Sequence, residues 1–169
     1  MSKPKFSVIP HYSFRELTDI TPEFLKRIGI KFFMLDLDNT IAAYNEHAPS
    51  DIVISWYSEI RSSGIELFIV SNSSRDNRVR SFSKLLDTDF IMRAHKPSPK
   101  AIKSAIVANG YSANVSAFAG DQVFTDALAA NLAGVVSIVV KPIRMKNPFL
   151  AVRYFFEIPF RAMCRSGSV

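Results

Sequence analysis

Two aspartates, Asp36 and Asp38, follow a run in which every residue from 32 to 35 is apolar. Side chains two residues apart point to the same side of an extended strand, so a turn here would bring both carboxylates to the strand's carboxyl end. Carboxylates held this close repel each other unless a cation or a proton lies between them. The pair therefore indicates chemistry rather than packing.

Similar polar positions follow three other hydrophobic runs. Ser71 and Asn72 come after residues 66–70, Lys96 comes after residues 90–92, and Asp121 comes after residues 115–119. If these runs are neighbouring parallel strands, their carboxyl ends meet at one edge of a sheet, where ligands bind in such folds. The sequence therefore predicts one site built from four strand ends.

The elements that must hold these residues in place alternate along the chain. Short apolar strands are predicted at 32–37, 66–70, 90–92, 115–119 and 135–140, and amphipathic helices at 50–63, 75–86, 99–109 and 124–133. Gly64, Gly110 and Gly134 follow three of these helices, as glycines at helix ends do. Repeated strand–helix–strand units predict a five-stranded parallel sheet in a three-layer α/β/α sandwich.

Length and composition favour one domain. The 169 residues divide into an N-terminal arm (1–30), a core (31–140) and a basic, aromatic tail (141–169). The single cysteine suits a reducing compartment, and no apolar run is long enough to span a bilayer. A secretory signal is not expected, so we predict a cytoplasmic protein, in solution or peripheral on the inner face of a membrane. The net charge of +6 favours anionic partners.

Four motifs occur in a fixed order across residues 31–140. They are Asp36-Leu37-Asp38-Asn39-Thr40, Ser71-Asn72, Lys96-Pro97 and Gly120-Asp121-Gln122-Val123-Phe124-Thr125-Asp126. This order resembles the haloacid dehalogenase (HAD) superfamily of phosphotransferases. Within it, the chain is similar to subclass IIIA and to the capless group typified by YqeG-like proteins and mitochondrial phosphatidylglycerophosphate phosphatase. Asn39, where many relatives have Gly, is part of that likeness.

The resemblance implies a role for each catalytic carboxylate. Asp36 is expected to attack phosphorus and form an aspartyl-phosphate. Asp38 is expected to protonate the leaving oxygen and then to activate water, work that suits a raised pKa. We therefore predict a raised pKa for Asp38.

The resemblance also implies a Mg²⁺ cofactor and a phosphate cradle. The expected metal ligands are Asp36, the backbone carbonyl of Asp38, and Asp121, with Asp126 as a direct or neighbouring carboxylate. The expected phosphate contacts are the Ser71 hydroxyl, the Asn72 amide, Lys96 and the supporting residue Thr40.

The chain lacks room for the cap domain that many relatives carry. About ten residues separate Thr40 from the next helix, and residues 71–96 hold one helix and one strand. We therefore expect an open site, suited to phosphates on large molecules or at surfaces. The favoured substrate is phosphatidylglycerophosphate, and a soluble sugar or nucleotide phosphate is the alternative. A non-catalytic regulatory or RNA-contacting protein is a third hypothesis. The full set of catalytic positions argues against lost catalysis, and a nucleic-acid partner is not expected because no recognised RNA motif appears.

The tail interleaves basic residues with phenylalanines, and two interpretations are open. The first, which we favour, packs Phe149, Val152, Phe156 and Phe160 onto the sandwich. The second places this cationic, aromatic helix at an anionic lipid surface. Both can hold together, with Phe155 and the arginines facing outward. The N-terminal arm is expected to form a helix that buries its apolar side chains near the first strand.

Overall fold

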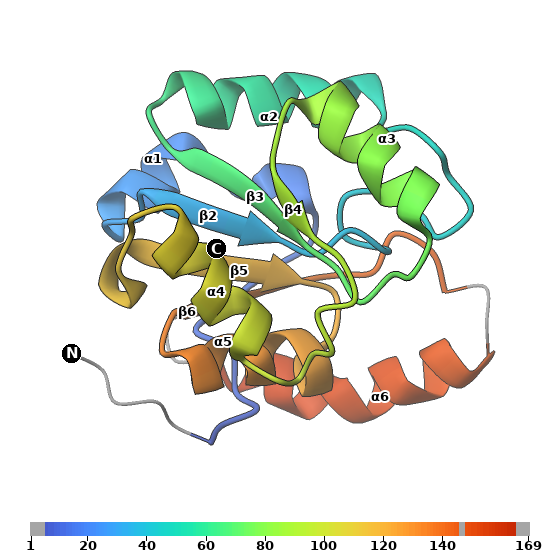
Figure 1. Cartoon of the computed structure of the whole chain (residues 1–169). Coiled ribbons are helices and arrows are strands. Elements are labelled where there is room, and N and C mark those ends of the chain that lie inside the picture. The colour runs from blue at the N-terminus through green and yellow to red at the C-terminus, as the bar shows by residue number, and fades with distance from the viewer. Residues whose placement is uncertain (1–5, 146–147, 165–169) are drawn as a thin grey trace.

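A computed structural model, which describes residues 6–145 and 148–164, contains one six-stranded parallel sheet. Figure 1 shows its strands running side by side through the centre of the molecule. Their order is β1-β6-β5-β2-β3-β4. The strands are β1 (Tyr12–Phe14), β2 (Phe32–Leu35), β3 (Glu66–Val70), β4 (Phe90–Ile91), β5 (Ser116–Gly120) and β6 (Val136–Val140). The five predicted strands are all present.

Helices cover both faces of this sheet and make the predicted three layers (Figure 1). Helices α1 (Pro22–Arg27), α2 (Asp51–Ser62) and α3 (Asp76–Leu86) contribute to the core on one face. Helices α4 (Lys100–Ala108) and α5 (Leu128–Ala133) form the core on the other. Because β2 is covered on both sides, all four of its side chains are buried.

The sixth strand comes from the N-terminal arm, which we had placed outside the sandwich. Residues Tyr12–Phe14 pair in parallel with residues Ile138–Val140 of β6. A strand of three residues that begins just after Pro10 is too short to show an alternating hydrophobic pattern in the sequence. This strand is therefore defined only by its pairing with β6. The arm does bury its apolar side chains as predicted, but its α-helix is only six residues long.

The chain leaves the sheet earlier than predicted after β2. The strand ends at Leu35, and Asp36 begins a loop in which Asn39 has a φ of 60°. Asn tolerates this left-handed conformation better than most residues, which accounts for Asn or Gly at this position. The segments 36–50 and 71–75 contain an isolated bridge between Asp38 and Ala42 but no helix or strand. The site is therefore capless, as expected.

The tail forms helix α6 (Pro148–Ala162), and the packing that we favoured for it is wrong. Phe149, Val152 and Phe156 are exposed, and only Phe160 is partly buried, against the residues that follow β5. Phe155 faces outward as expected, whereas Arg153 and Arg161 turn toward the protein. Residues 146–147 and 165–169 of the predicted tail, and 1–5 of the arm, lie outside the described residues.

No helix in the described part of the chain has the length and apolar character needed to cross a bilayer.

Candidate active site

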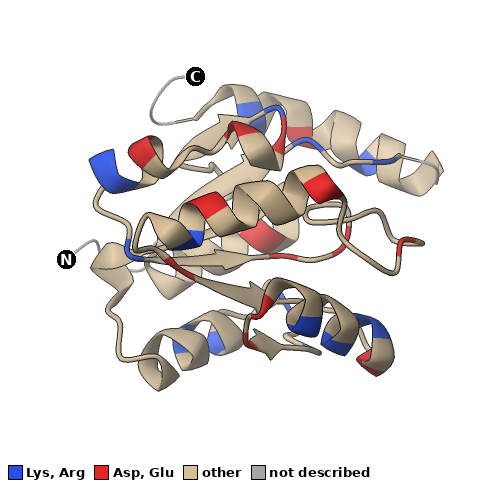
Figure 2. Ribbon diagram, turned by 90° about the horizontal axis from the view of Figure 1, so that it is seen from above, with Lys and Arg blue, Asp and Glu red and all other residues tan. Residues whose placement is uncertain are grey.

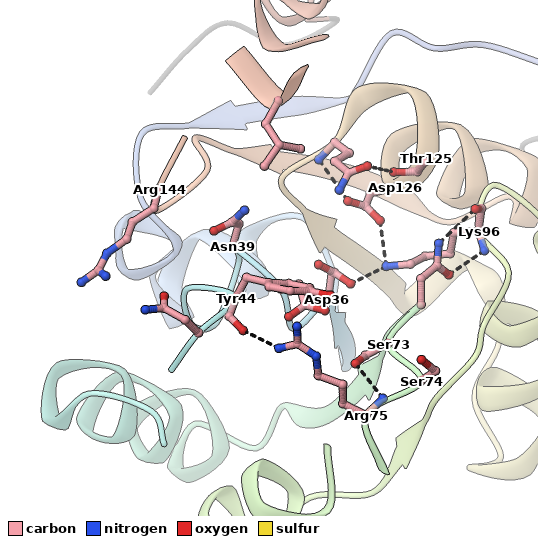
Figure 3. Close-up of a pocket in the computed structure, with 15 residues that line it drawn as sticks. Asp36, Asn39, Tyr44, Ser73, Ser74, Arg75, Lys96, Thr125, Asp126 and Arg144 are labelled. Atoms are coloured by element: carbon pink, nitrogen blue, oxygen red, sulfur yellow. Dashed lines mark hydrogen bonds and ion pairs between the residues drawn. The ribbon is translucent and has the colours of Figure 1, made fainter. Parts of the chain in front are cut away.

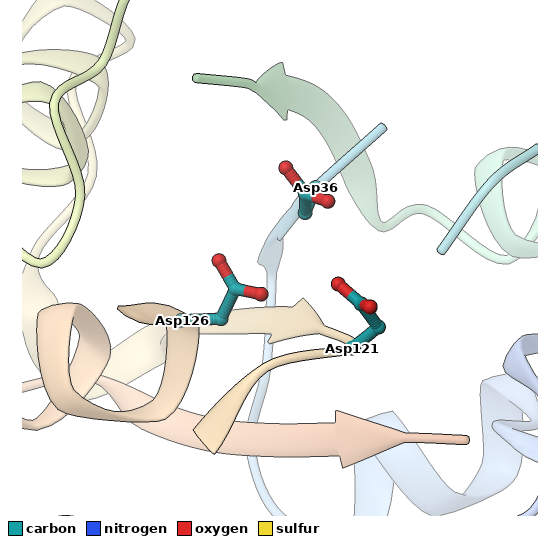
Figure 4. Close-up of side chains that lie close together, drawn as sticks. All are labelled: Asp36, Asp121 and Asp126. Atoms are coloured by element: carbon teal, nitrogen blue, oxygen red, sulfur yellow. The ribbon is translucent and has the colours of Figure 1, made fainter. Parts of the chain in front are cut away.

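Three buried aspartates meet at the carboxyl edge of the sheet. Asp36 follows β2, Asp121 follows β5, and Asp126 lies in the turn beyond β5. One carboxylate oxygen from each lies within 4.8 Å of the others, and Figure 4 shows the three side chains converging. Hard oxygen ligands of this kind suit Mg²⁺.

Lys96 is the cation that this arrangement already contains. Its Nζ lies 2.6 Å from Asp36 Oδ1 and 2.8 Å from Asp126 Oδ1, with all three side chains buried (Figure 3). Burial by itself lowers the pKa of Lys96, but the carboxylates of Asp126 and Asp36 outweigh it and raise that pKa. Lys96 therefore stays charged inside the protein, as a group that neutralises phosphate must.

Asp36 is held between competing influences. Burial raises its pKa to about 7, although Lys96 opposes the shift, while Asp126 and Asp38 add to it. The Thr40 hydroxyl lies 3.5 Å from Asp36 Oδ2 and donates to it, which fits the supporting role predicted for Thr40. Near neutral pH, a bound cation would shift this carboxyl toward its ionised form.

The side chain of Asn72 holds the loop that contains Lys96 through two hydrogen bonds to its backbone. Its Oδ1 accepts the backbone N–H of Lys96 at 2.8 Å, and its Nδ2 donates to the Lys96 carbonyl at 3.1 Å. Ser71 is completely buried and its Oγ accepts the Ser73 N–H at 3.1 Å. The pocket lining includes Asn72, Ser73 and Ser74 but not Ser71.

Asp38 does not join the carboxylate cluster, because Arg78 of α3 holds it. Arg78 Nη1 donates to Asp38 Oδ1 at 2.7 Å, while its other nitrogens donate to the carbonyls of Glu46 and Ala43. Burial still raises the pKa of Asp38 above its usual value, with Arg78 opposing it. The predicted direction of this pKa shift is confirmed.

Asp121 supplies the clearest sign that a cation belongs here. It is almost fully buried, and neither carboxylate oxygen has a hydrogen-bond partner among the described residues. Burial raises its pKa well above the usual value, with Asp126 and Asp36 adding to the shift. Arg153 of α6 is a distant ion-pair partner at 3.8 Å. Buried, unsatisfied carboxylate oxygens are costly, so this donor set fits a metal ion.

Asp126 reaches the cluster through an unusual turn. Residues Val123–Ala127, predicted as the start of an α-helix, form a π-helical turn before α5. Asp126 Oδ2 accepts the Gln122 N–H at 3.0 Å, and a Cβ built on Gly120 would overlap the Asp126 side chain. The glycine ending β5 is therefore required for Asp126 to lie beside Asp36 and Asp121.

A pocket of about 750 Å³ opens above these groups. Figure 3 shows Asp36, Lys96 and Asp126 at one side and Arg75, Tyr44 and Arg144 around the remaining wall. Its lining includes the predicted residues Asp36, Asp38, Asn72, Lys96 and Asp126.

Several lining or supporting residues were not predicted. Arg75 donates to the Tyr44 carbonyl at 2.9 Å and lies over the Tyr44 ring. Arg144 and Leu150 join the wall from the tail. Arg78 had a weak signal in the sequence, as a basic residue between the apolar positions of an amphipathic helix. Arg153 had none, because its distance from Asp121 in the chain conceals the contact.

Fold and site together define a phosphatase of the HAD superfamily: a doubly wound parallel sheet with paired aspartates after a central strand, and lysine and further aspartates at neighbouring strand ends. Residues 1–143 match the model of a family described as mitochondrial PGP phosphatase, where PGP is phosphatidylglycerophosphate. The chain belongs to this family.

Individual relatives agree with this assignment. The chain is 33% identical over 142 residues to "Probable phosphatase YqeG" of Bacillus subtilis (strain 168), covering 84% of this chain and 82% of that protein.

Two solved phosphatases share the fold. One is the cobalt-bound deoxy-D-mannose-octulosonate 8-phosphate phosphatase of Haemophilus influenzae, with a TM-score of 0.54, 15% identity, and coverage of 68% of this chain and 70% of that chain. The other is the 3-deoxy-D-manno-octulosonate 8-phosphate phosphatase of Moraxella catarrhalis, in complex with magnesium, phosphate and KDO. Its TM-score is 0.50 and its identity 18%, and the match covers 69% of this chain and 80% of that chain.

Proposed function

We propose that this enzyme hydrolyses a phosphate monoester through an aspartyl-phosphate on Asp36, and that its favoured substrate is phosphatidylglycerophosphate. The observation that carries the proposal is the position of Asp36 at the pocket wall. Lys96 Nζ lies 2.6 Å from Asp36 Oδ1, and the buried carboxylates of Asp121 and Asp126 are close enough to bind one metal ion together with Asp36.

The reaction balances with two carboxyl groups. An Asp36 oxygen forms a bond to phosphorus as the bond to the leaving alkoxide breaks, and protonated Asp38 gives that alkoxide its proton. Ionised Asp38 then takes a proton from water, whose oxygen attacks phosphorus and releases Asp36 and inorganic phosphate. The raised pKa of Asp38 supports a group that is protonated in one step and ionised in the next. The charge of Lys96 balances the transferring phosphoryl group.

Asp36, Asp121 and Asp126 would hold Mg²⁺, together with the Asp38 carbonyl. When bound, the ion reduces repulsion between the Asp36 carboxylate and the anionic phosphate. The unsatisfied oxygens of Asp121 support this assignment.

The shape and charge of the pocket support a large, doubly anionic substrate. Among the described residues no cap element covers the site, and Arg75 and Arg144 line the wall in addition to Lys96. Phosphatidylglycerophosphate carries a terminal monoester phosphate and a diester phosphate, so these cations could pair with the second charge. We place the reaction at the cytoplasmic face of an anionic membrane. A soluble sugar or nucleotide phosphate is the second candidate, because the 750 Å³ pocket also suits a small ligand.

The chemistry is tested by Asp36→Asn with magnesium present. We expect phosphate release to fall by at least about a thousandfold, because the nucleophile is lost. Asp89→Asn, at an exposed position, is the matched control. Undiminished release by Asp36→Asn would refute the aspartyl-phosphate.

The substrate is tested by comparing kcat/KM for phosphatidylglycerophosphate in mixed micelles with kcat/KM for a panel of soluble phosphate monoesters. We expect the lipid to exceed every soluble compound by at least about tenfold. A soluble compound with the higher kcat/KM would replace the lipid as the substrate and leave the mechanism intact.

A further inference from the structure

Helix α6 buries its charges and exposes its apolar side chains. Glu157 is fully buried, and Arg161 donates to it at 3.0 Å and to the Val140 carbonyl at 3.0 Å. Phe155 and Phe156, by contrast, are 69% and 62% exposed. An ordinary surface helix has the opposite arrangement. The helix is thus anchored to the sheet by polar groups, which leaves an apolar face available.

This apolar surface is concentrated in the tail. Of the fourteen large apolar side chains found exposed in the described residues, eight lie between positions 143 and 163. They are Ile143, Met145, Phe149, Val152, Phe155, Phe156, Ile158 and Met163. Figure 2 shows α6 mostly in tan, with few charged positions. Contiguous exposed apolar surface of this kind marks a site of interaction.

Exposed basic side chains lie near the start of the tail, together with the exposed Glu16. Arg15 and Lys141 are exposed and adjacent, since the Lys141 N–H donates to the Arg15 carbonyl at 3.2 Å. Arg144 is also exposed and pairs with Glu46 at 3.3 Å. Within the described residues 141–145 and 148–163, the only acidic residue is the buried Glu157. No carboxylate of this segment would therefore repel an anionic surface.

The apolar face adjoins the mouth of the pocket. Arg144 and Leu150, at the start of the tail, both line the pocket wall. Arg15 and Lys141 directly follow β1 and β6, so they lie at the same edge of the sheet as the carboxylate cluster. Figure 1 shows the N-terminal turns of α6 extending past the carboxyl ends of the strands. A surface that contacts α6 would consequently face the opening of the site.

We propose that residues 143–145 and 148–163 form a bilayer-docking surface: the exposed apolar side chains of α6 insert among the lipids, and Arg15 and Lys141 contact anionic headgroups. A convex helix face with phenylalanines and neighbouring cations matches a lipid interface. This deepens the proposed function and depends on it only for the identity of the reacting lipid. Docking would present the pocket to headgroup phosphates without extraction of the lipid.

The test is co-sedimentation with vesicles of phosphatidylglycerol and phosphatidylcholine, compared with vesicles of phosphatidylcholine alone. We expect the wild type to bind the mixed vesicles. The double variant Phe155→Ser/Phe156→Ser should weaken this binding by at least about tenfold, because two apolar anchors are lost. Leu85→Ser, at an exposed apolar position on α3 across the sheet, is the matched control and should bind as the wild type does. Lys141→Glu should reduce the preference for anionic vesicles.

Binding and chemistry are measured separately. The double variant should keep wild-type turnover of a soluble phosphate monoester, and Asp36→Asn should bind vesicles normally. If the wild type binds vesicles but does not hydrolyse phosphatidylglycerophosphate, the proposed substrate is refuted and the proposed docking surface is not. Equal vesicle binding by the double variant and the wild type would overturn the docking surface. The docking surface would also be overturned if the wild type sediments as a dimer and the double variant as a monomer, because the apolar face would then bind a second copy of the chain.

Discussion

Asp36 and Asp38 are two residues apart, yet the structure gives their carboxylates different surroundings. Asp36 pairs with Lys96 and lies in the cluster with Asp121 and Asp126. Asp38 turns toward Arg78 and borders the pocket. Burial raises the pKa of both, but only Asp36 has the neighbouring carboxylates that a metal ion requires. Separate environments are what allow one carboxyl group to attack and the other to transfer protons.

Asp38→Asn should separate these two roles. We expect kcat to fall by about a hundredfold or more, since an amide cannot transfer the proton, while magnesium affinity stays within about twofold. Calorimetric titration measures the metal and phosphate release measures kcat, with Asp89→Asn as control. Unchanged kcat would rule Asp38 out as the proton-transfer group.

The raised pKa of Asp36 predicts how metal binding depends on pH. Its folded-state pKa of about 7 exceeds the usual value of 3.8, so between these pH values the metal-free folded state binds more protons than the unfolded state. Ionisation of Asp36 therefore destabilises the metal-free protein as pH rises through this window. Magnesium requires the ionised carboxylate, so its stabilising effect should grow from about pH 6 to about pH 8.

Thermal unfolding with and without saturating magnesium measures this effect. The rise in Tm caused by magnesium should be larger at about pH 8 than at about pH 6, and Asp89→Asn should behave as the wild type. A rise in Tm that is the same at both pH values would contradict a proton-linked metal site.

At the scale of the elements, hydrogen bonds between loops hold the site together. Asn72 binds both backbone groups of Lys96, and Arg78 of α3 binds the loop after β2 through two carbonyls as well as Asp38. The π-helical turn after β5 brings Asp126 over Gly120. Lys96 and Asp38 are thus each positioned by an element other than their own.

Arg78→Lys tests this support. Lysine keeps the charge but cannot reach three acceptors with one planar group, so we expect the free energy of unfolding to fall by about 1–3 kcal/mol, with lower kcat. Urea denaturation provides the measurement. Arg80→Lys on the same helix, where the arginine is exposed, should change neither quantity. Equal stability of both variants would show that Arg78 does not hold the loop.

On the scale of the whole molecule, the tail and the sheet form one unit. Arg161 donates to the Val140 carbonyl of β6, to the Asp121 carbonyl beside the carboxylate cluster, and to the Glu157 carboxylate. These contacts join the last helix to the centre of the site, while the opposite face of that helix supplies the proposed lipid surface. Docking and catalysis therefore share one element.

Arg161→Ala should disrupt this joint. It leaves Glu157 buried without its closest partner, so we expect the free energy of unfolding to fall by about 3 kcal/mol. Phe155→Ala, on the exposed face, should change it by less than about 0.5 kcal/mol. If urea denaturation gives equal values for the two variants, the polar anchoring of α6 is refuted.

The core strands, the three layers, the absence of a cap and the family could all be predicted from the sequence. The strands and layers follow from local periodicity, the absence of a cap from the short segments between motifs, and the family from the resemblance carried by the ordered motifs. The motifs lie directly after strands, and parallel strands must bring their carboxyl ends to one edge. For the same reason Asp36, Lys96 and Asp121 could be assigned to one site, and the resemblance added Asp126. The raised pKa of Asp38 also followed from the role that the resemblance implies.

The distant residues that complete that site could not be predicted from the sequence. The strand Tyr12–Phe14, the partner of Asp38 in Arg78, and the approach of Arg153 to Asp121 depend on contacts between distant segments, which leave no local period. The orientation of α6 was predicted wrongly because its phenylalanines and arginines both recur at helical spacing. Two carbonyls at the sheet, of Val140 and Asp121, accept hydrogen bonds from Arg161, and together with the packing of Phe160 they determine which side of that helix faces the protein.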